Sequence, residues 1–585
     1  MRLKMNIKKY NAIDIETDGL DINDKINFIG IHTFDNDEDP GEFIILECAK
    51  DNLDILNELC KPGHINIFHN GKFDTRMIKH HYGITIPMTH DTMLLAYLCS
   101  TAPELINNRG KWLGLKPCAQ RLLGVEDWDV TLSKKTSHSR EEVEPYLKKD
   151  VYYTRLIYQK LRDMIDPLDK KTYWLMMKAT EVYRDVEEHG VPINVEQLKE
   201  TLEEYQEILA DIDSQLKMYS DINWNSPKQL QDLLYVQLGL EIPCYTDTGQ
   251  PGTGIEALTK LKGKHEIVDL ILKRREADKA LTFLKDWLEK QHNGIIYPTF
   301  NLHTTVTGRT SCNNPNFQQV PRNKKLKNLF QSIDPEWEMV CLDYSQAELR
   351  TAAVVAGVQA IKDSYNNGED LHRNMAALVA GCKPEEVTKQ QRTQAKAINF
   401  GYLYGMQPKS FVSYAKLSYG VDVTLDEATH IRNKFFESYK ELPYYYESTQ
   451  QELLHKGYVT SIMGRRYKVR SEDIVNPYER SNYLRKILNF PVQSAASDIM
   501  LCALIEIHDT LPKDEVQMIA TVHDSVELLI KKNGHFKDNI LKIQKIMQHP
   551  KLMDKFLTVP WDVPLVADIE IGPFGSGVDL DEYEV

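Results

Sequence analysis

The pattern of apolar residues changes along the chain and divides it into regions of different structure. Over the first 165 residues, short strand-like runs alternate with helix-like segments, which predicts an α/β domain built on a sheet. From about residue 170 to 290, apolar residues recur every three or four positions, so this region is expected to be mostly helical. Strand-like runs at 294–301, 339–342, 516–520 and 526–530 then lie on either side of a largely helical insert at 363–480. The 585 residues therefore predict a multidomain chain of α/β and α+β regions.

The composition is that of an ordinary globular protein. Hydrophobic residues make up 42% of the chain and charged residues 27%, which excludes the disordered and fibrous classes. No uninterrupted apolar run approaches the roughly 18 residues of a membrane span, and MRLKMNIKKY lacks the apolar core of a signal peptide. The nine cysteines are scattered, with no C-x-x-C pair, so we expect reduced thiols. These features predict a cytoplasmic protein without a membrane partner.

The net charge of −14, from 71 basic and 85 acidic residues, by itself argues against a nucleic acid partner. Net charge is an average, however, and a protein with acidic metal sites can also carry basic clusters that bind phosphates. Two such clusters occur, at 322–327 and at 464–470, and the second contains Arg465 and Arg466. Taken alone, each cluster is more often a solvated surface.

Acidic residues in the N-terminal region have the spacing of metal ligands. Asp14 and Glu16 are two apart on a predicted strand, so both carboxylates project from one face. Asp74 lies in a second segment, and Tyr146 and Asp150 are one helical turn apart in a third. Hydrolysis of a phosphodiester by two Mg²⁺ ions needs several carboxylates and a group that orients the attacking water. Each pair alone is usually a surface feature, whereas the three segments together indicate such a site.

Two further aspartates lie at the ends of strand-like runs in the C-terminal half. Asp343 follows the apolar run at 339–342, which is where a buried strand emerges. Asp524 lies in a predicted tight turn between the runs at 516–520 and 526–530. The two aspartates therefore could supply carboxylates to one two-metal site.

Between these aspartates, one predicted helix face combines cations with rings. Arg392, Lys396 and Phe400 follow each other at intervals of four residues, and Tyr404 comes one turn later. Such a face suits a triphosphate and a stacked base. An amphipathic helix with an aromatic seam explains the same spacing equally well.

The N-terminal motifs resemble those of a known enzyme class. Asp14-Ile-Glu16, Asn70-x3-Asp74 and Tyr146-x3-Asp150 are similar to the three motifs of the DEDDy-type 3′–5′ proofreading exonucleases. The resemblance implies an RNase H-like domain in which four carboxylates hold Mg²⁺ and Tyr146 orients the water. The implied metal ligands are Asp14, Glu16, Asp74 and Asp150.

The C-terminal motifs resemble those of family A DNA polymerases, the class of bacterial DNA polymerase I and its phage relatives. The segments 307–311 and 315–321 look like the family's primer–template segment, and 343–350 (DYSQAELR) matches its motif A. The stretch 392–405 matches motif B, His523-Asp524 matches motif C, and Asn489-Phe-Pro-Val-Gln493 resembles a template-contacting motif. The resemblance extends over the chain from about residue 10.

This resemblance implies roles for the residues that bind metal and nucleotide. Asp343 and Asp524 would hold two Mg²⁺ ions, for which Mn²⁺ is a possible substitute. Arg392 and Lys396 would bind the incoming triphosphate, with Lys396 also the candidate general acid. Three more residues would contact or select the nucleotide: Phe400 by stacking, Tyr404 by shaping the nascent pair, and Glu348 by excluding a ribose 2′-hydroxyl.

The resemblance also implies partners and an architecture. The partners are primer–template DNA and deoxynucleoside triphosphates, with no processivity partner identified. The residues expected to contact the DNA or the primer terminus are Arg309, Asn489, Gln493 and His523, together with Arg465 and Arg466 of the basic cluster. The expected division is an exonuclease domain at 1–165, linker helices and thumb at 166–295, palm at 296–362 and 481–585, and fingers at 363–480.

Two departures from the family pattern qualify the prediction. Motif C usually reads His-Asp-Glu, and Ser525 stands here in place of the Glu. Bacterial members also carry a 5′-nuclease domain, for which there is no room before Asp14, so a replicative, phage-encoded enzyme is expected. The alternatives are a single-subunit RNA polymerase, which should lack the exonuclease motifs and Glu348, and a non-catalytic DNA-binding protein with decayed sites.

Overall fold

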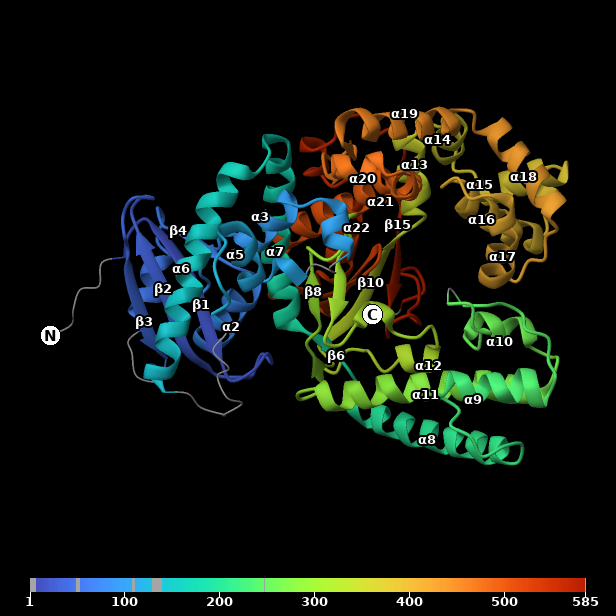
Figure 1. The fold of residues 1–585 in the computed structure, drawn as a ribbon, viewed down its shortest axis with the longest axis horizontal. Coiled ribbons are helices and arrows are strands. Elements are labelled where there is room, and N and C mark those ends of the chain that lie inside the picture. Colours follow the sequence, from blue (N-terminus) through green and yellow to red (C-terminus); the bar gives the residue numbers. More distant parts are fainter. Residues whose placement is uncertain (1–6, 49–52, 108–110, 129–138, 247, 584–585) are drawn as a thin grey trace.

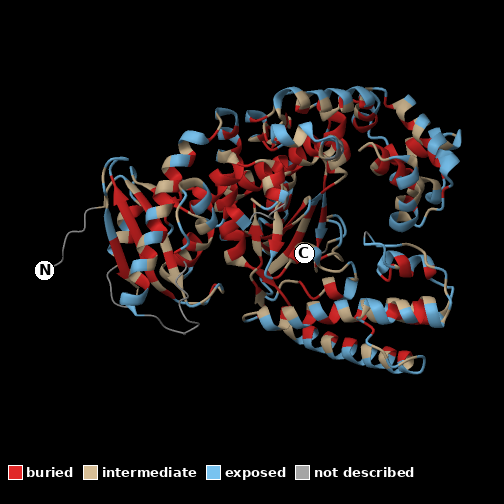
Figure 2. Cartoon of the chain, in the orientation of Figure 1, coloured by how far each residue is buried: buried red, intermediate tan, exposed pale blue. Residues whose placement is uncertain are grey.

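The computed structural model describes residues 7–48, 53–107, 111–128, 139–246 and 248–583. Residues 1–6, which belong to the segment that lacks a signal-peptide core, lie outside this description. Figure 1 shows an N-terminal lobe beside a larger body, in which a central sheet lies between the helices α16–α18 and the helices α8–α11. The buried residues form the interior of both parts (Figure 2).

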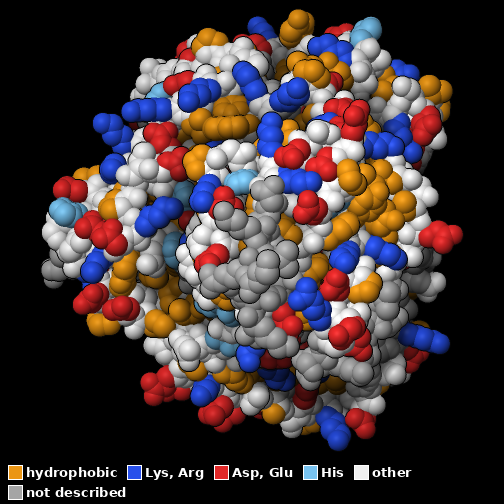
Figure 3. Space-filling view, turned by 90° about the vertical axis from the view of Figure 1, so that its left-hand side faces the viewer, with side chains coloured by type: hydrophobic (Ala, Val, Ile, Leu, Met, Phe, Trp, Pro, Cys, Tyr) orange, Lys and Arg blue, Asp and Glu red, His pale blue; other side chains and the backbone are white. Residues whose placement is uncertain are grey.

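The N-terminal lobe is an α/β domain, as its sequence pattern predicts. Its five-stranded sheet has the order β3-β2-β1-β4-β5, in which β1–β3 pair antiparallel and β4 and β5 continue in parallel. The strands are β1 (Tyr10–Thr17), β2 (Ile26–Phe34), β3 (Glu42–Glu47), β4 (Ile65–Phe68) and β5 (His90–Asp91). The helices are α1 (Asp54–Leu59), α2 (Lys72–Tyr82), α3 (Thr92–Cys99), α4 (Ala102–Asn107), α5 (Leu115–Leu123) and α6 (Arg140–Met164). On the end of the molecule formed by this lobe, basic and acidic side chains are interspersed (Figure 3).

A mostly helical region follows, as the three- and four-residue periodicity predicts. It comprises α7 (Lys170–His189), α8 (Val195–Lys217), α9 (Pro227–Gln231), α10 (Ile255–Leu261) and α11 (Glu266–Lys290). The helices α8 and α11 pack side by side, and their outer ends with α9 and α10 share a separate small core around Leu216, Leu234 and Ile271. Short strand pairs then lead to the central sheet: β6 (Val191–Pro192) with β7 (Ile295–Ile296), and β8 (Thr299–Asn301) with β9 (Ser311–Asn313).

The central sheet is built from strands that lie far apart in the sequence. It has the order β13-β14-β10-β15, and all neighbours are antiparallel. The strands are β10 (Trp337–Tyr344), β13 (Val516–Val522), β14 (Ser525–Lys531) and β15 (Ala567–Ile571). On one face Tyr344 Oη donates to the backbone oxygen of Met547, in α22 (Phe536–Gln548), at 2.6 Å. Asp343 therefore projects from the opposite face, because successive side chains of a strand alternate.

The helical insert forms a second core. Its elements are α13 (Ala347–Val355), α14 (Gln359–Asn366), α15 (Leu371–Ala380), α16 (Lys389–Tyr402), α17 (Pro408–Tyr419), α18 (Leu425–Ser438) and α19 (Glu441–Lys456). The chain returns through β11 (Tyr458–Thr460), β12 (Arg466–Lys468), α20 (Ser471–Val475) and α21 (Pro477–Thr510). One stretch of α21, Asn482–Thr510, has the length and the mean hydropathy (1.3) of a membrane span. Because 89% of that window is buried inside the protein, its apolar side chains are covered by the protein itself.

Helix α7 connects the N-terminal lobe to the central sheet through buried charges. Glu187 binds Lys72 and Arg76 of α2, and it also accepts the backbone N–H of Phe300 at 2.6 Å. One turn earlier, the hydroxyl of Tyr183 lies 3.1 Å from that of Thr521 in β13. The lobe and the sheet are therefore both fixed to one helix.

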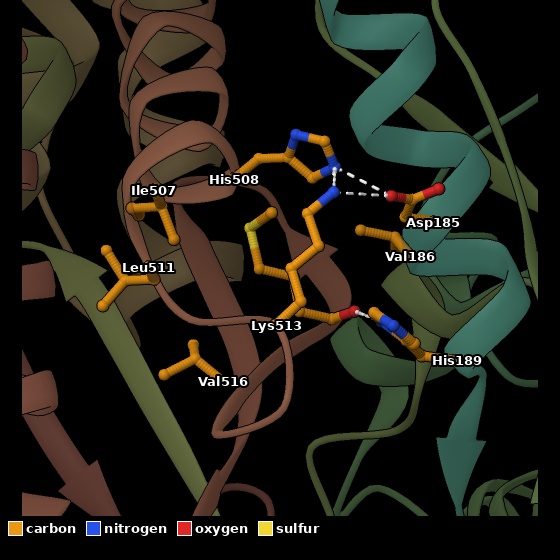
Figure 4. Close-up of a pocket in the computed structure, with 9 residues that line it drawn as sticks. Asp185, Val186, His189, Ile507, His508, Leu511, Lys513 and Val516 are labelled. Carbon is orange, nitrogen blue, oxygen red and sulfur yellow. Dashed lines mark hydrogen bonds and ion pairs between the residues drawn. The ribbon is translucent and has the colours of Figure 1, made fainter. Parts of the chain in front are cut away.

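Asp185 extends this junction to α21 (Figure 4). Its carboxylate accepts from Lys79 at 3.1 Å and from Lys513 at 3.3 Å, and it lies 2.8 Å from His508 Nε2. Burial opposes ionisation here, but the contacts with His508, Arg184 and Lys79 hold the pKa of Asp185 well below its usual range. The carboxylate therefore stays ionised and keeps the three elements together.

The Glu187 contacts lead to a prediction about stability. Glu187→Ala should destabilise the protein by about 3–5 kcal/mol, because Lys72 and Arg76 would stay buried without their counter-charge. Glu181→Ala is the control, since its pair with Lys178 on the same helix is exposed, and such pairs contribute about 0–1 kcal/mol. Calorimetric unfolding of both variants measures the difference. Equal losses would show that the buried contacts do not stabilise the junction.

Candidate active sites

The structure brings the N-terminal acidic residues together at one edge of the sheet. Asp14 and Glu16 lie on β1, where Ile13 and Ile15 alternate with them and point into the core. Asp150 comes from α6, and one carboxylate oxygen each of Asp14, Glu16 and Asp150 lies within 4.8 Å of the others. Three hard oxygen ligands at this spacing fit a divalent cation such as Mg²⁺.

Asp74 adjoins this group from the first turn of α2. Its side chain is 5% exposed, and its Oδ1 accepts the backbone N–H of Ile15, between the two β1 carboxylates, at 3.1 Å. The helix begins after Asn70 and Gly71, whose backbone N–H groups donate to Asp91. The turn before α2 thus fixes Asp74 against β1.

Mutual repulsion and burial perturb the ionisation of these carboxylates. Burial, followed by the charges of Asp74, Asp150 and Glu16, raises the pKa of Asp14 well above its usual value. Burial and the charge of Asp150 raise the pKa of Glu16 to about 7, and burial raises that of Asp74 to about 8. A bound divalent cation would remove this repulsion, which is why the residues present fit a metal site.

The sequence analysis did not identify two side chains that contact this site. Trp128 Nε1 donates to Asp150 Oδ1 at 2.6 Å, and Lys116 of α5 places its ammonium group 4.7 Å from the centre of the Tyr146 ring. Lys116 also opposes the rise in the pKa of Glu16. Neither residue belongs to a motif with the acidic residues in sequence, and only the packing of α5 against α6 brings Lys116 there.

The second acidic pair meets at the edge of the central sheet. Asp343 is the penultimate residue of β10, and Asp524 lies in the two-residue turn between β13 and β14. The backbone N–H of Tyr344 donates to the backbone oxygen of Asp524 at 3.2 Å, so strand end and turn touch. Asp343 is exposed, but desolvation by the surrounding protein and the charges of Asp524, Asp568 and Glu570 raise the pKa of its carboxyl group to about 6. Burial likewise raises the pKa of Asp524.

A hydrogen-bond network beside these aspartates involves three predicted residues. Glu348, on α13, binds Arg309 through one oxygen and accepts the hydroxyl of Tyr404 at 3.1 Å through the other. Arg309 lies in the segment before β9, and Tyr404 follows α16. The network therefore connects motif A with motif B and the primer–template segment.

The side chains of α16 that are predicted to bind the nucleotide lie on the helix face opposite its buried face. Ala395, Ile398 and Tyr402 are buried, whereas Lys396 is exposed and Phe400 is half-buried. Arg392 Nε donates to Asp370 at 2.6 Å, a partner that the sequence analysis did not consider. The spacing of four thus yields one accessible face, and the roles of its residues in nucleotide binding stay predictions.

Two arginines of the basic cluster at 464–470 have aspartate partners that the sequence analysis did not consider. Arg465 is 2% exposed and donates three hydrogen bonds to the buried Asp498, and Arg466 binds Asp166 and Asp169. These guanidinium groups connect the β12 segment to α21 and to the start of α7, so both are paired with aspartates of the protein, and their contact with DNA stays a prediction. Arg465 packs directly under Gly308, next to Arg309.

The other predicted DNA contacts have these positions. Asn489 and Gln493 lie one turn apart on α21, both half-buried. His523 is exposed in the turn beside Asp524 and has a left-handed backbone conformation (φ 57°). Their contacts with DNA stay predictions.

Comparison with known families identifies the larger part of the chain. Residues 194–574, more than half of the sequence, match the family described as DNA polymerase family A. The chain belongs to DNA polymerase family A. Residues 2–166 match the family described as 3′-5′ exonuclease.

Individual relatives support the same assignment. DNA polymerase I of Aquifex aeolicus is 30% identical over 552 residues, which cover 90% of each protein. The enzymes from Borreliella burgdorferi and Bacillus subtilis are 29% and 32% identical, over 96% and 68% of this chain. The chain spans only 62% and 45% of the length of those two relatives.

A solved structure shares the fold. The polymerase domain of Pol1 from M. smegmatis, in complex with DNA primer-template and dNTP, superposes with a TM-score of 0.81 over 97% of this chain and 96% of that chain. Its sequence identity is 21%. The two family matches, at residues 2–166 and 194–574, confirm the predicted order of an exonuclease domain followed by a polymerase domain, and the solved structure shows that the fold is shared.

These matches decide between the alternatives raised by the sequence. The chain is a family A DNA polymerase with a 3′–5′ exonuclease domain, and neither an RNA polymerase nor a non-catalytic DNA-binding protein is supported. The relatives named here are bacterial, so they lend no support to the expected phage origin.

The repulsion among the N-terminal carboxylates predicts an effect of metal removal. In EDTA, Asp14→Asn should stabilise the protein by about 1 kcal/mol or more, roughly 2–4 °C for a domain of this size, because it removes one buried like charge. The same variant should lose most of the stabilisation that Mn²⁺ confers on the native protein. Calorimetry with and without Mn²⁺ measures both effects, with Asp163→Asn, at an exposed position of α6, as the control. An unchanged response of Asp14→Asn to Mn²⁺ would exclude Asp14 as a ligand.

Proposed function

We propose that this polymerase extends a DNA primer along its template with deoxynucleoside triphosphates at a site built around Asp343 and Asp524. The observation that carries the proposal is the contact between the end of β10 and the β13–β14 turn, because it brings together two carboxylates 181 positions apart in the sequence. The primer-template DNA and dNTP bound by the M. smegmatis protein support the same class of substrates here.

The residues around the aspartates have complementary roles in this proposal. Asp343 and Asp524 would hold Mg²⁺, or Mn²⁺ in its place, and a bound ion would supply activation of a primer 3′-hydroxyl and charge stabilisation for the leaving pyrophosphate. Lys396 and Arg392 bind the triphosphate through charge-assisted hydrogen bonds, and Lys396 supplies a proton to the leaving group. The hydrogen bond of Arg392 to Asp370 uses Nε, and the guanidinium group has four further N–H donors that can bind a phosphate.

Selection of the nucleotide falls to the residues that surround the base and the sugar. Phe400 offers a ring face for stacking, and Tyr404 limits the width of the nascent pair. Glu348, held by Arg309 and Tyr404, blocks the space of a ribose 2′-hydroxyl. Asn489, Gln493 and His523 contact the DNA near the primer terminus.

We also propose that the N-terminal site removes nucleotides from a primer 3′ end by the DEDDy-type reaction. Asp14, Glu16, Asp74 and Asp150 would hold the metal ions, and the hydroxyl of Tyr146 would orient the attacking water. The ammonium group of Lys116 over the Tyr146 ring stabilises the ring's position. A site that trims primers beside one that extends them is suited to proofreading during DNA replication, which we propose takes place in the cytoplasm.

The two activities should be separable, because their carboxylates belong to different domains. Asp14→Ala with Glu16→Ala should abolish degradation of single-stranded DNA, by about 10³-fold or more, while primer extension stays within about twofold. Asp524→Asn should have the opposite effect. Gel assays on one labelled primer–template, with and without nucleotides, measure both activities. Parallel loss of both activities in a folded variant would refute the assignment of two sites.

The position of Glu348 predicts an effect on sugar selection. Glu348→Ala should lower the preference for deoxyribonucleotides over ribonucleotides by about tenfold or more, because it opens space beside the sugar and releases Arg309 and Tyr404. Glu348→Gln keeps the bulk and should keep most of the preference. Single-nucleotide incorporation with matched dCTP and CTP measures the ratio. If Ala and Gln have the same effect, the charge of Glu348 and not its volume determines selection.

A further inference from the structure

Glu527 is a buried carboxylate in β14, three residues after Asp524. Its side chain is 1% exposed, and it interrupts a strand in which Val526, Leu528 and Ile530 are fully buried. A carboxyl group in such a place is costly unless its hydrogen bonds are satisfied. Its presence therefore requires a structural or functional reason.

The register of the sheet places Glu527 on the face that carries Asp343. Ser525 pairs with Asp343 and Glu527 pairs with Cys341, two residues earlier on β10. Directly paired residues of antiparallel strands project from the same face, and so do residues two apart on one strand. Glu527, Ser525 and Asp343 thus lie on one face, next to the turn that contains Asp524.

The contacts of Ser525 connect Glu527 to that turn. The Ser525 hydroxyl donates to Glu527 Oε1 at 3.0 Å, and it also lies 3.1 Å from the backbone oxygen of Val522, on the other side of the turn. A hydroxyl has one proton to donate, so Ser525 shares it between these two acceptors. The other oxygen of Glu527 is buried on the same face as the thiol of Cys341, its partner across the strands, which also interacts with the carboxyl group.

The turn itself needs such support. Only His523 and Asp524 separate the paired residues Val522 and Ser525, and His523 has a positive φ of 57°. A residue with a Cβ rarely adopts this conformation unless the surrounding structure holds it there. The hydrogen bonds of Ser525 fix the start of β14, where the strained turn ends.

We propose that Glu527 is a positioning residue of the polymerase site, which holds the Ser525 hydroxyl and thereby fixes the turn that sets Asp524 against Asp343. The inference rests on the proposed function, in which these two aspartates hold the metal ions. Ser525 stands where the family's motif C usually has Glu. Glu527 provides a carboxyl group two positions later in the same strand.

The test compares a variant that keeps the hydrogen-bond acceptor with variants that remove the contact. Glu527→Gln retains an oxygen for the Ser525 hydroxyl and should incorporate nucleotides within about threefold of the native rate. Glu527→Leu and Ser525→Ala should each lower the single-turnover rate by about 10- to 100-fold, the range seen when a partner of a metal ligand is removed. Both should raise the Mg²⁺ concentration needed for half-maximal rate.

Further measurements separate positioning from general damage to the sheet. The double variant Ser525→Ala/Glu527→Leu should be no slower than Glu527→Leu, because both changes break one contact. Exonuclease activity should stay unchanged in every variant, which reports that the chain is folded. Glu338→Leu, which removes a carboxylate from β10 far from the turn, is the control and should incorporate at the native rate.

Three outcomes would overturn the inference. Glu527→Leu within twofold of the native rate would exclude a positioning role, and so would additive losses in the double variant. If Glu527→Gln loses as much as Glu527→Leu, the charge of Glu527 and not its contact with Ser525 is what matters. If Glu527→Leu does not fold, Ser525→Ala decides by the same criteria. Robust incorporation by Asp524→Asn would instead refute the proposed function itself.

Discussion

A carboxylate withdrawn from water needs a positive charge or hydrogen-bond donors close by, and this requirement determines much of the structure. Where the two domains meet, the requirement is met within the protein. Asp185 and Glu187 of α7 bind basic side chains of α2, and Asp498 of α21 binds Arg465. At the two active sites, carboxylates instead face one another, and the pKa of Asp74 rises to about 8. The carboxylates that are paired with basic side chains stabilise the junction. The carboxylates that face one another are suited to binding divalent cations.

The two active sites depend on the same helix for their relative position. Glu187 of α7 contacts α2, which also carries Asp74, and one turn away Tyr183 contacts Thr521, three residues before Asp524. Packed side chains and buried ion pairs therefore connect the exonuclease domain to the central sheet. The contacts of α7 thus set the spacing of the two acidic sites.

Most of the candidate site residues could be predicted because their signals are local. Asp14 and Glu16 share a face of β1 because side chains of a strand alternate, and Tyr146 and Asp150 share a face of α6 because they are one turn apart. Local signals could not identify the aspartate partners of Arg465 and Arg466. Sequence shows that a charge run exists, but whether its partners are phosphates or buried aspartates depends on residues 30 to 300 positions away.

Periodicity, turns and motif spacing act within a few residues, so they specify the elements, their order and the chemistry available at each motif. Which motifs meet depends on contacts between distant parts of the folded chain. Asp343 and Asp524 are brought together by the pairing of β10 with β14. The same pairing places the contact of Ser525 with Glu527 beside Asp343. Lys116 reaches the Tyr146 ring only through helix packing. Such contacts depend on strand register and on burial. Both are determined by the whole chain, because the fold must bury apolar side chains and provide hydrogen-bond partners for buried polar groups at the same time.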